Sequence, residues 1–122
     1  NMPLELGLFL GAKRFGGRKQ GSKRSLILDI DPHRYLAFIS DIRGQDINAY
    51  DGTPASLIGR VAAWLRDIAG RDHMPGGAAI AGEFQTFRQD LPALCRERQL
   101  TLDELTFLDF KRLATAWIEA VA

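Results

Sequence analysis

The sequence predicts an α/β fold, in which part of a parallel sheet is followed by a carboxyl-terminal helical extension. The run at 25–30 is short, apolar and continuous, which is typical of a strand buried on both faces of a sheet. An apolar helical segment precedes it at 1–15, and amphipathic helical patterns follow it. We therefore divide the chain into the carboxyl-terminal part of an α/β domain at 1–50 and a helical extension at 51–122.

The composition is that of one globular domain, but the charge is unevenly distributed. The 122 residues are 46% hydrophobic and 25% charged, with a formal net charge of +1. Residues 1–24 contain six basic side chains and one acid, a local balance of +5, so the rest of the chain sums to −4. The basic side chains belong to a glycine-rich segment that contains one aromatic residue, Phe15.

The number of cysteines and the hydropathy of the chain predict its cellular location. Cys95 is the single cysteine, so an intrachain disulfide is excluded and no metal site is expected from the ligand spacing. No apolar run approaches the ~18–20 residues that cross a bilayer, and no signal-peptide pattern is present. We expect a cytoplasmic protein that does not contact membranes.

The first predicted helix carries an unusual carboxylate. Asn1 is a suitable N-cap, and a proline follows in the first turn, where a missing N–H costs little. The segment is apolar nearly all round, which predicts a buried helix that ends between Gly11 and Phe15. Glu5 lies between two leucines, and burial of a carboxylate is costly unless it is paired or has a chemical role. The following segment at 16–23 is predicted to be a flexible, solvated loop.

The predicted strand at 25–30 must pair with other strands to form a sheet. After its carboxyl end we expect one or two helical turns at 33–40, then a polar loop that leads into a short strand at 47–50. Two strands do not make a stable sheet. We expect the missing strands to come from residues upstream of Asn1 or from another chain, and we favour the first source.

The carboxyl-terminal half predicts successive helices. Thr53 and the proline after it start a helix that ends at Gly70. A second helix at about 78–98 is expected to bend or split at Pro92. A last helix is predicted at about 107–120. Two further helix starts are indicated by the pairs Thr101 with Glu104 and Thr106 with Asp109.

The amino-terminal segment resembles a known family. Asn-Met-Pro-Leu-Glu-Leu-Gly-Leu-Phe-Leu-Gly at 1–11, followed after a basic loop by the strand Leu-Ile-Leu-Asp, is similar to bacterial TIR-like domains of a nucleotide-binding type. It also resembles the Glu-x-Gly helix of nucleoside 2-deoxyribosyltransferase-like proteins. The resemblance covers about 30 of 122 residues, and the connection from Phe15 onward is longer than in these families. It implies a partial flavodoxin-like (TIR-like) parallel sheet and, for several members, a role in anti-phage defence.

The resemblance also implies a reaction. It places Glu5 at the bond between a ribose and its base, as the catalytic group for hydrolysis or transfer at an N-glycosidic bond. NAD or a related nucleotide is the expected substrate, no further cofactor is expected, and a homo-oligomer or partner chain would complete the sheet. The expected nucleotide contacts are Asn1, Gly7, Asp29 and Asp41. The alternative is a non-catalytic nucleotide-sensing or protein-interaction module of the same fold.

Each of these residues has a plainer interpretation. Glu5 is also favoured in a first helical turn by the helix dipole, and Asn1 can be a simple cap. Asp29 precedes Asp31-Pro32, a common turn opening, although ligands bind at the carboxyl ends of strands in open α/β sheets. Asp41 lies in a polar loop that suits either ligand contacts or a local ion-pair network.

The basic segment at 13–24 suggests a third function. It can bind the phosphates of a nucleotide or of a nucleic acid backbone, although the plainer interpretation, a solvated flexible loop, is favoured. Nucleic-acid binding predicts a strongly salt-dependent affinity. That affinity should fall when Lys13, Arg14, Arg18 and Lys19 are changed to alanine.

Overall fold

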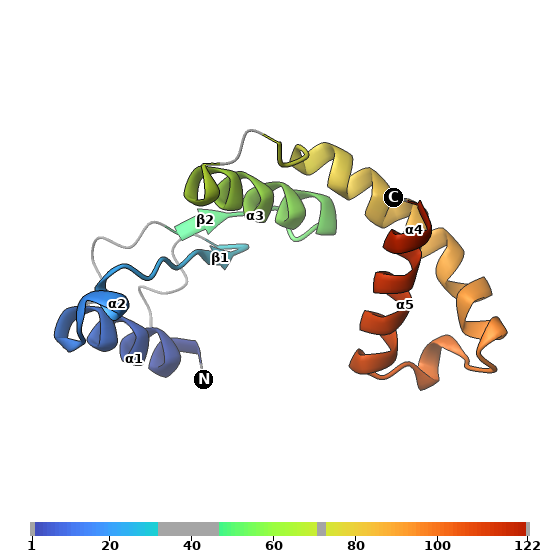
Figure 1. Cartoon of the computed structure of the whole chain (residues 1–122), viewed down its shortest axis with the longest axis horizontal. Helices are drawn as coiled ribbons and strands as arrows, with labels where there is room; N and C mark the ends of the chain where they lie inside the picture. Colours follow the sequence, from blue (N-terminus) through green and yellow to red (C-terminus); the bar gives the residue numbers. More distant parts are fainter. Residues whose placement is uncertain (1, 32–46, 71–72, 122) are drawn as a thin grey trace.

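The computed structural model describes residues 2–31, 47–70 and 73–121, and these are predominantly helical. Figure 1 shows an open arch. The helices α1 and α2 form one limb, α4 and α5 form the other, and α3 lies between them beside two short strands. The elements are α1 (Met2–Phe15), α2 (Arg18–Gly21), β1 (Ile27–Asp29), β2 (Ile47–Ala49), α3 (Pro54–Ala69), α4 (Gly77–Glu97), the 3-10 turn η2 (Leu102–Glu104) and α5 (Phe107–Val121).

The predicted flavodoxin-like sheet is wrong. In the part of the chain that the structure describes, the sheet consists of β1 and β2 alone, paired in parallel with Ile27 beside Ile47 and Asp29 beside Ala49. The pairing continues one residue further, where the Tyr50 N–H donates to the Asp29 carbonyl oxygen at 3.1 Å. All six strand residues are half-buried, so neither strand is an interior strand with both faces covered. The chain is instead built mainly from helices.

The bounds of α3 follow from its capping residues, and the prediction for this helix is confirmed. The Thr53 hydroxyl accepts the Ser56 N–H at 3.2 Å, and the proline after Thr53 occupies the first helical position. Gly70 ends the helix in the left-handed conformation, with φ of 55°. Asp51 accepts the Thr53 N–H and hydroxyl at 2.9 and 2.6 Å, and these hydrogen bonds lower the pKa of Asp51.

The main core lies between α4 and α5. Phe87, Cys95 and Leu113 are buried there. The Phe87 ring meets the rings of Phe110 and Trp117 edge to face, at centroid distances of 5.5 and 5.6 Å. The Trp117 indole N–H also donates a hydrogen bond to the Asp90 carboxylate of α4. The other residues that pack on this core are Phe84, Leu91, Leu94, Leu100, Leu105 and Ala114.

Helix α4 continues through Pro92. Of the two outcomes expected at Pro92, a bend or a split, the split is wrong, because α4 runs from Gly77 to Glu97 with this proline inside it. The two threonine–carboxylate starts are confirmed. Thr101 and Glu104 form a reciprocal capping box at η2, and the Thr106 hydroxyl donates to the Asp109 carboxylate at the start of α5. The threonine hydrogen bonds lower the pKa values of both carboxylates.

Helices α3 and α4 approach each other at two glycines. A Cβ atom on Gly77 would lie 2.6 Å from the Gly59 Cα and 3.4 Å from its N and O atoms. A Cβ atom on Gly59 would meet nothing within 4 Å. The crossing of α3 and α4 therefore requires glycine at position 77, because any side chain there would collide with α3. Position 59 has room for a Cβ atom, so glycine is not required there.

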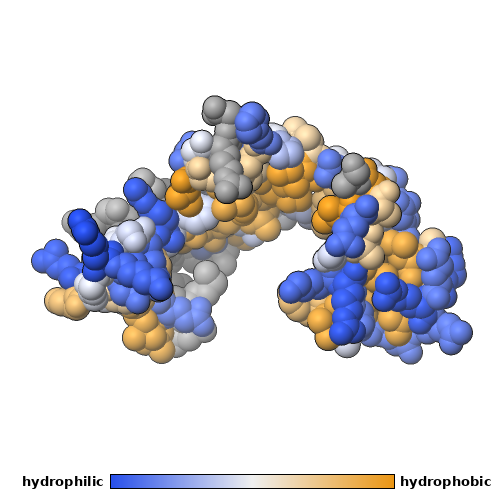
Figure 2. Space-filling model, viewed as in Figure 1, coloured by the Kyte–Doolittle hydropathy of each residue, from blue (hydrophilic) through white to orange (hydrophobic). Residues whose placement is uncertain are grey.

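The arch leaves much of its surface open. Its accessible surface is 9466 Å², against about 6,600 Å² for a compact monomer of this mass. Among the described residues, the buried hydrophobic side chains are Ala62 and the three of the α4–α5 core. Figure 2 shows apolar surface along the central part of the arch and between α4 and α5. The prediction that the first helix is buried is also wrong, because Leu4 and Leu8 of α1 are exposed.

Candidate functional site

The limb formed by α1 and α2 carries the strongest concentration of one type of charge. Helix α1 has an acid in its first turn and two basic residues in its last turn, the arrangement that complements the helix dipole. The Gly16 N–H donates to the Ala12 carbonyl oxygen at 2.9 Å, and α2 then folds back on α1. A Cβ atom on Gly16 would collide with that carbonyl and with the Gln20 side chain, so the tight turn requires glycine.

Two local hydrogen bonds follow at the end of α2. The Ser22 hydroxyl donates to the Lys19 carbonyl oxygen at 3.0 Å, and the Lys23 N–H donates to the Gln20 carbonyl oxygen at 3.2 Å. Gln20 is half-buried between the two helices, while the basic residues of α2 are exposed. The segment predicted to be a flexible loop at 16–23 thus contains a short helix that gives its cations defined positions.

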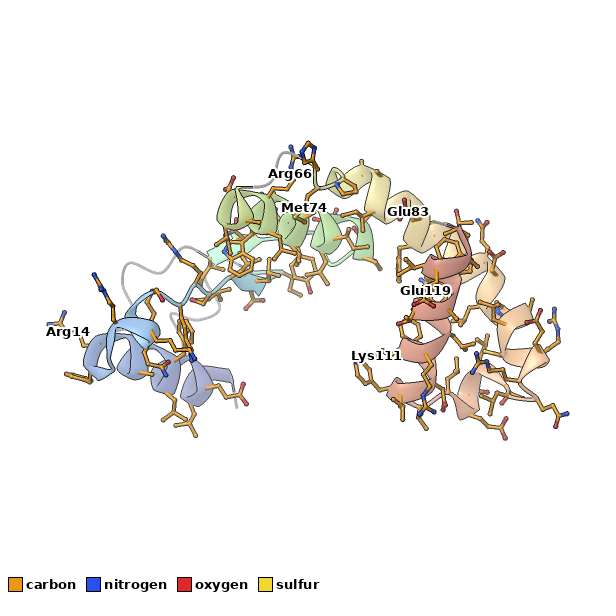
Figure 3. All side chains as sticks on the ribbon, viewed as in Figure 1. Arg14, Arg66, Met74, Glu83, Lys111 and Glu119 are labelled. Carbon is orange, nitrogen blue, oxygen red and sulfur yellow. The ribbon has the colours of Figure 1, made fainter. Side chains whose placement is uncertain are left out.

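Four cations lie on α1 and α2, and two more lie on the segment that directly follows α2. Between Glu5 and Asp29 the sequence contains no carboxylate. Within the described ranges, none of the six cations makes an ion pair. Figure 2 shows hydrophilic side chains gathered over this limb, and Figure 3 shows Arg14 extending from its outer end. We call these residues the basic surface: Lys13, Arg14, Arg18, Lys19, Lys23 and Arg24.

An exposed aromatic ring lies within the basic surface. Phe15, the last residue of α1, is 88% exposed and lies between Arg14 and the glycine turn. On the preceding turns, the Lys13 ammonium is 5.9 Å from the centroid of the Phe9 ring, a cation–π distance. An exposed ring beside several cations can stack on a nucleobase while the cations contact phosphates.

The predicted catalytic residue lies on the same helix but in an open setting. Glu5 is exposed in the first turn of α1, and its neighbour Gly7 is exposed as well. A Cβ atom on Gly7 would meet nothing within 4 Å, so the space beside it is open. Glycosidic cleavage by a carboxylate benefits from a site that excludes water, and the described residues do not enclose Glu5. A catalytic role for Glu5 stays a prediction.

The other predicted contacts are distributed differently. Asp29 is half-buried on β1, and its Oδ1 atom accepts the Asp31 N–H at 3.2 Å, a local turn hydrogen bond. Asn1, Asp41 and the expected helical turns at 33–40 lie outside the described residues. No group of three or more histidine, cysteine, aspartate or glutamate side chains in the described ranges is arranged to hold a metal ion. None of the described helices is long and apolar enough to cross a membrane.

Comparisons with family models, curated proteins and solved structures give no significant match to this chain. The resemblance of the segment at 1–11 to TIR-like domains therefore stays a prediction.

The sequence analysis noted Phe15 only as the one aromatic residue of the basic segment and did not predict a ligand contact there. The structure leaves its ring 88% exposed. The available signal was local: Phe15 is followed by two glycines and lies among six cations, a composition more typical of a ligand-binding surface than of a core.

Proposed function

We propose that the chain is a nucleotide-binding module whose basic surface holds phosphate groups, and that a single-stranded nucleic acid is the ligand it fits best. The observation that carries this proposal is the set of six cations within residues 13–24, with no carboxylate between Glu5 and Asp29. Such a surface attracts phosphates by releasing condensed counterions.

The shape of the surface favours a strand over a free nucleotide. Pockets for small ligands are concave and bury most of the ligand, whereas five of the six basic residues are exposed on the α1–α2 hairpin and the segment that follows it. An extended strand can contact several cations in succession and stack one base on Phe15. Cleavage of a glycosidic bond by Glu5 is not part of this proposal and stays a separate prediction.

Removal of four cations should weaken binding strongly. In the variant Lys13→Ala/Arg14→Ala/Arg18→Ala/Lys19→Ala, we expect the affinity for a fluorescent single-stranded oligonucleotide to fall about 100-fold at moderate salt, because four phosphate contacts are lost. Fluorescence anisotropy measures this directly. The matched control removes four exposed arginines elsewhere and therefore the same charge: Arg60, Arg66, Arg88 and Arg96. Equal losses in the two variants would show that net charge, and not the basic surface, determines binding.

The Phe15 ring should contribute stacking energy without affecting the salt dependence. We expect Phe15→Ala to weaken single-strand binding by about 1–3 kcal/mol, or about 5- to 150-fold. Phe15→Leu should lose most of the same energy, since it keeps apolar bulk but lacks the ring, and Phe15→Tyr should retain wild-type affinity. Polyphosphate binding should be unchanged in all three. If Phe15→Leu binds the oligonucleotide as wild type does, the ring does not stack on a base.

Ligand length distinguishes a strand from a free nucleotide. The proposal predicts that affinity rises from adenosine monophosphate through NAD to longer oligonucleotides, because each added phosphate reaches another cation. Tighter binding of NAD than of an oligonucleotide would instead assign the surface to a free nucleotide.

A further inference from the structure

Ser22 lies within the basic surface and carries a hydroxyl to which the proposed function assigns no role. In residues 1–25 the sequence contains two hydroxyl side chains, Ser22 and Ser25. Ser22 directly follows α2, its side chain is exposed, and its Oγ atom donates to the Lys19 carbonyl oxygen at 3.0 Å. Figure 1 shows the segment that runs from α2 to β1. The Ser22 hydroxyl is therefore accessible from solution.

Cations flank Ser22 on both sides. Two of them precede it by four and three residues, and two follow it directly. No carboxylate belongs to this part of the sequence. Kinases select their substrates partly by charge pattern, so a serine kinase with an acidic peptide groove would be attracted to this segment. The four flanking cations are Arg18, Lys19, Lys23 and Arg24.

The segment around Ser22 can open at little cost. Helix α2 consists of four residues and its backbone hydrogen bonds are local, so it unwinds more easily than a long helix. Residues 21–25 are all exposed. Ser25 is a less suitable acceptor, because β1 begins two residues later and its pairing at Ile27 with Ile47 would have to open.

A phosphate on Ser22 would oppose the attraction of this surface for nucleic acids. In the transfer, the Oγ atom forms a bond to the terminal phosphorus of a nucleoside triphosphate, the bond from that phosphorus to the nucleoside diphosphate breaks, and the hydroxyl proton passes to a base of the kinase. The product adds about two negative charges and removes the proton that Ser22 donates to Lys19. Neighbouring lysine and arginine side chains would then pair with this phosphate in place of a nucleic acid.

We propose that Ser22 is a phosphorylation site, and that its phosphate releases nucleic acid from the basic surface. The phosphate donor is a nucleoside triphosphate, and the catalyst is a separate serine kinase whose peptide groove is acidic. The release rests on the proposed function of the basic surface, whereas the modification of Ser22 does not.

Mass spectrometry of the full chain tests the site. The chain is incubated with magnesium ATP and a serine kinase that requires basic residues around its acceptor, without nucleic acid. We expect one phosphate, on Ser22, and transfer about tenfold slower in Arg18→Ala/Lys19→Ala, because two attractive charges are lost. Ser22→Ala should accept no phosphate, and Ser25→Ala should accept it as wild type does. A phosphate on Ser25 in place of Ser22, or on neither serine, overturns the proposed site.

Fluorescence anisotropy with a single-stranded oligonucleotide tests the release. Phosphoserine is incorporated at position 22 during translation, so that every chain carries it. We expect affinity to fall about tenfold at moderate salt and the salt slope to flatten by about 1.4, because two phosphate contacts are lost. Ser22→Ala should bind as wild type does.

The matched control carries phosphoserine in place of Thr115 on α5. Position 115 is exposed, and Lys111 and Arg112 on the preceding turn can pair with the added phosphate. This chain has the same net charge as the one modified at position 22 and should keep wild-type affinity. Equal losses in the two chains, or no loss at position 22, overturn the release. A wild-type chain that binds no oligonucleotide overturns the proposed function itself, and the site of phosphate transfer is still measured by mass.

Discussion

Replacement of Phe87 by alanine should lower the free energy of unfolding by about 3–5 kcal/mol. Phe87 is 4% exposed and contributes both edge-to-face contacts of the α4–α5 core, to Phe110 and Trp117. The substitution removes the ring and leaves a cavity that Cys95 and Leu113 cannot fill without movement. A loss of this size is a large share of the ~5–15 kcal/mol by which domains are stable.

Urea denaturation followed by circular dichroism and by tryptophan emission measures this effect. Trp117 lies in the affected core, where its indole N–H donates to the Asp90 carboxylate at 2.9 Å, so its emission should shift to the red at lower urea in the variant. Phe87→Leu is the control, because it retains most of the buried volume and should cost less than about 1.5 kcal/mol. Wild-type stability in Phe87→Ala would mean that this core does not stabilise the fold.

Replacement of Gly77 by alanine should destabilise the chain by about 1–3 kcal/mol, the usual cost of overpacking a close contact. The new Cβ atom would lie 2.6 Å from the Gly59 Cα, and backbone cannot rotate away as a side chain does. Helices α3 and α4 would have to separate at the point that joins the centre of the arch to the α4–α5 limb.

Gly59→Ala is an unusually close control for this prediction, because it changes the other glycine of the same contact. Its Cβ atom would meet nothing within 4 Å. Alanine also has the higher helix propensity in the interior of α3, by up to about 1 kcal/mol. We therefore expect Gly59→Ala to raise the urea midpoint slightly and Gly77→Ala to lower it. A decrease of the same size in both would contradict the described crossing.

The sequence predicts the helix ends well because the signals that set them are local. Thr53 with its following proline and Gly70 define α3 within their own neighbourhoods, through one hydroxyl and one left-handed backbone conformation. The same holds for Thr101 with Glu104 at η2. These interactions span three or four residues, so no knowledge of distant contacts is needed.

The sheet and the exposure of α1 could not be predicted in this way. The apolar run at 25–30 indicates a strand, but the number of neighbouring strands depends on residues far along the chain, and β2 alone pairs with β1 among the described residues. A helix that is apolar nearly all round is likewise predicted to be buried, because its sequence does not show whether another element covers it. In the structure Leu4 and Leu8 of α1 are exposed.

The candidate site could be predicted only in part from the sequence. The cations of the basic surface could be counted directly, and nucleic-acid binding was already a hypothesis for them. Their fixed arrangement could not be predicted, because it depends on the close approach of Gly16 to the Ala12 carbonyl and on the short helix α2.

The dependence of binding on salt measures how many phosphates the basic surface contacts. For a single-stranded oligonucleotide, the logarithm of the association constant should fall with the logarithm of salt concentration at a slope of about −4, since six cations each contribute about −0.7. Without Lys13, Arg14, Arg18 and Lys19 the slope should flatten to about −1.5. The control without the four distant arginines should keep the wild-type slope. An unchanged slope in the first variant, or no binding by the wild type, would show that the basic surface does not bind nucleic acid.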